Sequence, residues 1–96
     1  MSLFVVQHKH SAETCPAGSP EMGPMLVQHV APSNAARFGV TMRSDAVIDG
    51  QHTFYLILEA ESDSKVKEFM TPFYQAGSVD IWPASSCEQV VERARC

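Results

Sequence analysis

Residues that could bind a transition metal are concentrated near the N-terminus of the chain. Two imidazoles, a carboxylate and a thiol occur within the eight residues 8–15, as His8, His10, Glu13 and Cys15. Mixed imidazole and thiolate donors suit Zn or Cu ions better than Mg or Ca. We therefore expect a Zn or Cu site formed by His8, His10 and Cys15, with Glu13 as a fourth donor.

The position of these residues after an apolar run indicates how they are presented. The run that starts at Leu3 predicts a first strand over residues 3–10. Side chains at i and i+2 of a strand share a face, so His8 and His10 should point the same way, roughly 7 Å apart. Glu13 and Cys15 follow in a loop where the chain can turn back over this end of the strand.

Composition limits the class of protein. The 96 residues are enough for one domain, and 45% hydrophobic with 19% charged residues is an ordinary globular composition. The formal charge of −4 argues against a nucleic-acid partner, and no apolar segment is long enough to span a membrane. Three cysteines do not make a disulfide framework, so a reducing cytoplasmic location is expected.

Apolar periodicity and turn residues also predict the helices, the turn and the remaining strands that follow the first strand. Apolar residues at helical spacing predict a helix ending near residue 31 and a second helix beginning at residue 62 or 63. The second helix is expected to bend at Pro72 and to end at Gly77. Asp49-Gly50 predicts a tight turn between two strands. Ser85 and Glu88 have the spacing of a capping box at the start of a short C-terminal helix. The remaining strands are expected over residues 40–48, 52–61 and 78–83. Imperfect alternation over residues 40–48 leaves room for a bulge in that strand.

The resulting order is β-α-β-β-α-β with a C-terminal tail, which predicts an α+β, ferredoxin-like fold. We expect the first and third strands to be adjacent and parallel, with the other two strands at the edges of the sheet. The third strand has apolar residues on both faces, whereas two helices cover only one face. This pattern predicts that a second copy of the chain covers the other face, as a homodimer.

The junction from the second helix into the last strand, Phe73-Tyr74-Gln75-Ala76-Gly77-Ser78-Val79, adds to this pattern. With the element order and the two-sided sheet, it resembles the dimeric α+β barrel superfamily, and in particular its small members without an assigned activity. The resemblance implies two protomers packed sheet to sheet around a central cleft. No catalytic residue of that superfamily can be matched onto this chain.

The expected topology also predicts at which end of the sheet each of the other candidate ligands lies. If the first and third strands are parallel, Glu59 and Glu61 lie beside the end of the first strand, and Glu59 becomes an alternative fourth donor. His29, His52 and Cys87 would then lie at the opposite end of the sheet. His29 would be a core or interface residue, and His52 would face solvent beside the turn.

Two other functions remain open. The first is a cofactor-independent isomerase or monooxygenase that acts on a small apolar or aromatic molecule, with His8 or His10 as the general base. Its cleft would be lined by Phe54, Tyr55, Ile57 and Trp82. The second is an interaction subunit without chemistry. The motif itself also has an interpretation without a metal, in which His8 and His10 line the mouth of a polar cleft, Glu13 caps a turn and Cys15 is a small buried residue.

Overall fold

The computed structural model describes all 96 residues, which form an α+β fold with one sheet. The strands are β1 (Ser2–His10), β2 (Thr41–Ile48), β3 (Thr53–Ala60) and β4 (Gly77–Ala84). The α-helices are α1 (Met22–Val30), α2 (Pro32–Ala36), α3 (Asp63–Phe69) and α4 (Cys87–Glu92). Three short 3-10 helices complete the chain: η1 (Ala12–Thr14), η2 (Pro16–Gly18) and η3 (Thr71–Gln75).

The strands form one antiparallel sheet in the order β2-β3-β1-β4. The predicted adjacency of β1 and β3, with β2 and β4 at the edges, is confirmed, and the arrangement is compatible with a ferredoxin-like fold. The prediction that β1 and β3 are parallel is wrong, because His8 pairs with Phe54 in an antiparallel register. The cause is the β2–β3 hairpin: β2 runs in the same direction as β1, so the strand inserted between them must run in the opposite direction.

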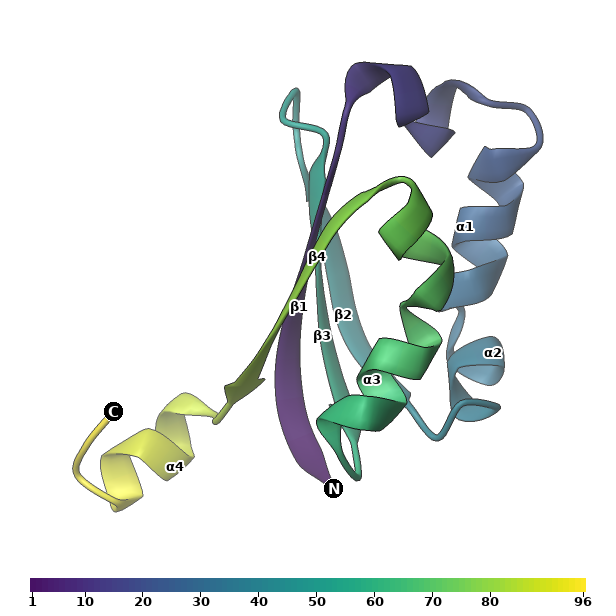
Figure 1. The fold of residues 1–96 in the computed structure, drawn as a ribbon. Helices are drawn as coiled ribbons and strands as arrows, with labels where there is room; N and C mark the ends of the chain where they lie inside the picture. Colours follow the sequence, from purple (N-terminus) through teal and green to yellow (C-terminus); the bar gives the residue numbers. More distant parts are fainter.

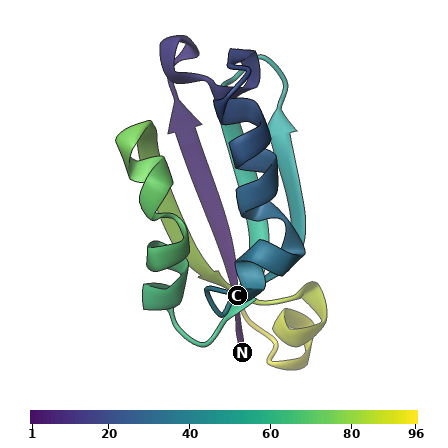
Figure 2. The ribbon, with the colours of Figure 1, turned by 90° about the vertical axis from the view of Figure 1, so that its right-hand side faces the viewer.

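The helices α1, α2 and α3 all lie on one face of the sheet, as the two views in Figures 1 and 2 show. The core lies between this helical layer and the sheet. Alternation along β1 and β3 places every second side chain in this core. The buried apolar residues are Phe4, Val6, Ala35, Val40, Phe54, Leu56, Leu58, Ala60, Val66, Phe69, Met70 and Phe73. No helix has both the length and the hydropathy that crossing a membrane requires.

Prolines and caps set the helix ends, which lie within a few residues of the predicted positions except at the end of the second predicted helix. The helix expected to continue to Gly77 ends at Phe69 as α3, and Pro72 lies in the separate helix η3. Pro has no backbone N–H to donate and its ring clashes with the preceding turn, so it ends the regular helix. The capping box is present one residue later than predicted, at Ser86 and Gln89. The predicted irregularity in β2 is confirmed as a register shift between Met42 and Ser44.

The other face of the sheet carries no helix. Val5 of β1 pairs with Ile57 on one side and Trp82 on the other, which makes an apolar row across three strands. Ile57 is 40% exposed and Trp82 is 46% exposed. The helix α4 buries none of its residues and projects away from the lower end of the sheet in Figure 1. The chain therefore leaves an apolar row on this face exposed to solvent.

We predict that Phe69→Ala lowers the free energy of unfolding by about 3–5 kcal/mol, because Phe69 is fully buried and its removal leaves a cavity in the core. Urea denaturation followed by circular dichroism measures this loss. Val91→Ala is the control, since Val91 is 77% exposed and should change stability by less than about 0.5 kcal/mol. A loss below about 1 kcal/mol for Phe69→Ala would show that α3 does not pack as described.

Candidate metal centre

The antiparallel pairing of β1 and β3 brings His52 to the same end of the sheet as His10. The backbone N–H of His10 donates to the carbonyl oxygen of His52 at 3.0 Å. The centroids of the two imidazole rings are 5.5 Å apart. The expectation that His52 lies at the far end of the sheet, facing solvent, is therefore wrong, because it depended on a parallel β1–β3 pair.

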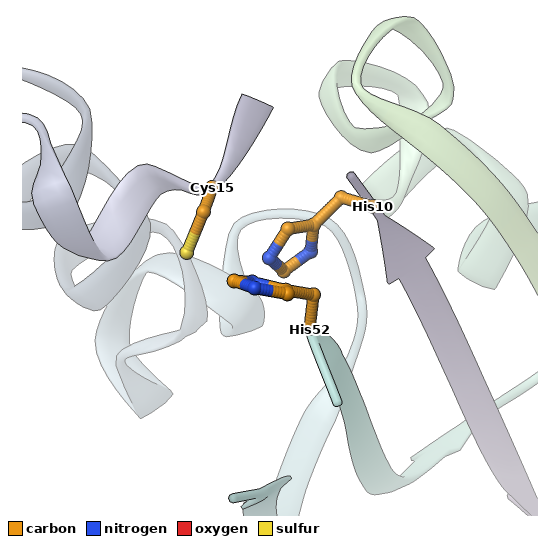
Figure 3. Close-up of side chains that lie close together, drawn as sticks. All are labelled: His10, Cys15 and His52. Carbon is orange, nitrogen blue, oxygen red and sulfur yellow. The ribbon is translucent and has the colours of Figure 1, made fainter. Parts of the chain in front are cut away.

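Two 3-10 turns fold the chain back over this end of β1 and position Cys15. Ser11 caps η1, since its Oγ accepts from the backbone N–H of Thr14 at 3.3 Å. The hydroxyl of Thr14 then donates to the carbonyl of Ala76 at 3.0 Å, which fastens the turn to the start of β4. The backbone N–H of Cys15 donates to the carbonyl oxygen of Ala12 at 3.4 Å. Cys15 consequently lies beside the two imidazoles (Figure 3).

One ligand atom from each of His10, Cys15 and His52 lies within 4.8 Å of the other two. Zn–N bonds of about 2.0–2.1 Å and Zn–S bonds of about 2.3 Å place the donors of one tetrahedral ion about 3.3–3.8 Å apart. The three donor atoms therefore need to approach one another by up to about 1.5 Å to share an ion, a distance that small side-chain rotations supply. The geometry is that of a candidate metal-binding triad.

The ring of His10 has no competing partner within the protein. Both of its nitrogens are buried, and neither makes a hydrogen bond to a protein atom. A buried polar atom without a partner is costly, by about 1–3 kcal/mol. A metal ion bound to one of these nitrogens would satisfy it, and no hydrogen bond would have to break. This observation supports the fit of the donor set to a transition-metal ion.

Burial keeps the imidazoles in the form that binds metal. Burial lowers the pKa of His10 below its ordinary value of 6.5, and the neighbouring His52 lowers it further, because two positive rings would repel each other. Burial also lowers the pKa of His8, and the charge on His10 adds to this effect, while a backbone hydrogen bond with Ser78 opposes it. His8 and His10 are therefore neutral at pH 7, and a neutral imidazole is the form that can donate a lone pair.

His52 has a left-handed backbone conformation, with φ of 51°. It ends the hairpin loop that begins at Asp49-Gly50, where Gly50 also has positive φ, at 76°. Left-handed conformation costs a residue with a Cβ about 1–2 kcal/mol, although His and Asn adopt it more readily than most residues do. Such strain often accompanies a functional position. Here it turns the imidazole of His52 toward His10.

A cavity of about 230 Å³ adjoins the triad. Its wall includes all three candidate ligands, and Asp49 is the only carboxylate on it. The remaining lining residues are Pro16, Ala17, Leu26, Val47, Ile48, Gly50 and Phe54. Three protein ligands that face a cavity leave the fourth position of a tetrahedral ion open to Asp49, to water or to another small molecule.

The other predicted ligands lie outside this group. His8 shares a face with His10, as expected for i and i+2, and their rings stack at 5.3 Å, but His8 does not belong to the triad. Glu13 is exposed on η1 and is also outside it. Glu59 lies at the opposite end of the sheet, where it pairs with Leu3 and forms a 2.8 Å ion pair with Arg43. Glu59 lies at that end because β3 is antiparallel to β1.

His29 and Cys87 are not part of the group either. A ring nitrogen of His29, Nε2, is hydrogen-bonded to the carbonyl of Phe69 at 2.8 Å, and the two rings stack at 4.6 Å. His29 therefore acts as a packing residue between α1 and α3. Cys87 begins α4 after the end of β4, which pairs with the Leu3 end of β1. Cys87 is thus at the far end of the sheet, as predicted.

The cleft expected for an enzyme is not present within the chain. Phe54 is buried against the helices, whereas Tyr55 and Ile57 point to the helix-free face together with Trp82. Because successive residues of a strand alternate between faces, Phe54 and Tyr55 cannot line the same cleft. His8 and His10 are also on the helical side, away from Trp82.

Comparison with known proteins assigns no role to these residues. No protein-family model matches the chain, and no curated protein matches it. The evidence for the site is therefore its own geometry. The sequence did contain a signal for His52: it lies two residues after Gly50 of the Asp49-Gly50 turn, so it must lie at the end of the sheet where that hairpin turns.

We predict that, with a chelator present, His52→Ala unfolds more readily than His52→Asn, by about 1 kcal/mol, because Asn tolerates positive φ better than Ala. Urea titrations of the two variants measure the difference. The matched pair Thr53→Ala and Thr53→Asn, one residue later in regular strand, should not show this preference for Asn. Equal stability of the two His52 variants would mean that the left-handed backbone does not constrain this position.

Proposed function

We propose that this protein is a small metal-binding protein that holds a Zn or Cu ion between His10, Cys15 and His52. The proposal rests on one observation, the convergence of three suitable donor atoms within 4.8 Å of one another. Two further features support it: the ring of His10 has no hydrogen-bond partner in the protein, and the triad faces a cavity. A reducing cytoplasm would keep the thiol of Cys15 available as a ligand.

Elemental analysis of the protein purified without a histidine tag tests this function directly. We expect Zn or Cu at one equivalent, and we expect the metal-free protein to take up one equivalent of Zn²⁺ in competition with a chromophoric chelator. His10→Ala, Cys15→Ser and His52→Asn should each weaken Zn²⁺ binding at least tenfold, because each removes one of three ligands. Asn is chosen at position 52 because it tolerates the local backbone conformation.

His29→Ala and Cys87→Ser are the matched controls. Each removes a side chain of a type that can bind metal, but neither residue belongs to the triad. Both should retain the affinity of the unmodified protein. A Co²⁺-loaded sample provides an independent readout, because a thiolate-to-metal absorption band should disappear in Cys15→Ser. Unchanged Zn²⁺ affinity in His52→Asn would refute the triad.

Proton competition gives a further prediction for the same site. Imidazole and thiol groups must lose their protons to bind, so Zn²⁺ affinity should weaken progressively as the pH falls below about 6. Burial lowers the pKa of His10, so protons compete with the metal for this ring only at a more acidic pH than they would for an exposed histidine. Titrations at constant ionic strength measure the effect. An affinity that does not change between about pH 5 and pH 7.5 would indicate that carboxylates bind the metal instead.

We also propose that the protein is a homodimer in which the helix-free faces of two copies meet, as the resemblance to dimeric α+β barrels implies. The row formed by Trp82, Val5 and Ile57 would be the centre of this interface. The position of helix α4 supports a second copy of the chain as the partner that covers this face. A groove of about 730 Å³ separates α4 from the sheet residues Leu3 and Glu59. An element of the partner could fill that groove.

Light scattering at micromolar concentration should therefore give the mass of two chains. Ile57→Glu places a charge at the centre of the row and should shift the protein to the monomer mass. Val27→Glu is the control, because Val27 is 69% exposed on the helical side and its replacement should leave the dimer intact. A monomer mass for the unmodified protein would exclude this arrangement.

A further inference from the structure

A second cavity lies on the helical side of the sheet, apart from the one beside the metal triad. It has a volume of about 190 Å³ and contains none of the three candidate metal ligands. Its wall is formed by α1, by the 3-10 turns after β1 and by the segment around η3, with His8 as the contribution of β1. The lining residues are His8, Thr14, Pro16, Met22, Met25, Leu26, His29, Pro72, Phe73 and Ala76.

His8 is the unusual member of this wall. Its side chain is only 1% exposed, and its Nδ1 atom is buried without any hydrogen-bond partner in the protein. The other polar side chains on the wall already have partners: Nε2 of His29 bonds to the carbonyl of Phe69, and the hydroxyl of Thr14 donates to Ala76. His8 is therefore the one polar side chain of the wall that has an unpaired ring nitrogen. Because this atom is closed to solvent, an occupant of the cavity reaches it only after a small rotation of the imidazole ring.

The shape and chemistry of the cavity restrict what it can hold. An apolar cavity of about 150 Å³ is known to accept benzene, so 190 Å³ fits a molecule with a single ring. Phe73 offers an aromatic edge, and Met22 and Met25 offer thioethers, which make favourable contacts with aromatic rings. No Lys or Arg lines the wall, so nothing there compensates the charge of a carboxylate.

We propose that this cavity binds a neutral single-ring aromatic molecule that carries one hydroxyl group, and that the hydroxyl bonds to Nδ1 of His8. A hydroxyl can both donate and accept a hydrogen bond, so it satisfies this atom in either neutral tautomer of the ring. The ring of the ligand packs between α1 and Phe73. The proposal does not depend on the metal triad, because His8 is not a ligand there.

Phenol and toluene are the probes that test this site, because they have nearly the same size and differ in the hydroxyl group. Calorimetric or NMR titration of the unmodified protein should show tighter binding of phenol. His8→Phe keeps a ring but removes the nitrogen, so the ratio of phenol affinity to toluene affinity should fall by about tenfold or more. Cooperative unfolding and an unchanged far-ultraviolet circular dichroism spectrum would show that His8→Phe is folded.

A second pair of variants tests the location without altering the core. Met25→Trp places a larger side chain at the mouth of the cavity, where Met25 is 66% exposed, and should weaken the binding of both probes. Val27→Trp is the control, because Val27 is equally exposed on the same helix but does not line the cavity. Three results would overturn the proposal: no binding of either probe, tighter binding of toluene by the unmodified protein, or undiminished binding in Met25→Trp.

Discussion

The antiparallel pairing of β1 with β3 is the constraint on which the rest of the structure depends. β1 is a central strand and pairs along its whole length with β3 on one side and β4 on the other. This register places the start of β3 beside the end of β1, so His52 meets His10. It also sends Glu59 to the opposite end of the sheet. The composition of the candidate metal centre follows from the direction of one strand.

The alternation of β1 has a second consequence, because it places two histidines on the face that forms the core. His8 and His10 continue the inward series of Phe4 and Val6, and their stacked rings lie in largely apolar surroundings. Burying ring nitrogens without hydrogen-bond partners, as at Nδ1 of His8 and at both nitrogens of His10, destabilises the fold. Each ring lines a different cavity, so two neighbouring residues on one rigid strand supply polar atoms to two separate candidate sites.

The triad combines one rigid element with two loops. His10 belongs to a strand that is paired on both sides, whereas Cys15 follows a 3-10 turn and His52 ends a hairpin loop in a left-handed conformation. Loops can move by the small distance that metal coordination requires, and the strand limits how far the site can open. The hydrogen bond from Thr14 to Ala76 restricts the first loop, and the backbone pairing of His10 with His52 restricts the second.

The sequence alone determined the order of the elements and which faces of the helices and strands are apolar. It also determined the bulge in β2 and the placement of His8 and His10 on one side of β1. All of these features follow from local periodicity and turn chemistry. It also identified Cys15 and His10 as candidate ligands of one ion. Only the tertiary structure decided which other residue joins them. Strand direction is a property of the whole sheet, since it depends on how a crossover helix and a hairpin combine. The Asp49-Gly50 turn places His52 at the hairpin end of the sheet, but the turn alone does not show that the end of β1 lies there too. The cavity beside His8 likewise requires α1 and η3 to pack over β1, which brings together side chains from distant parts of the chain.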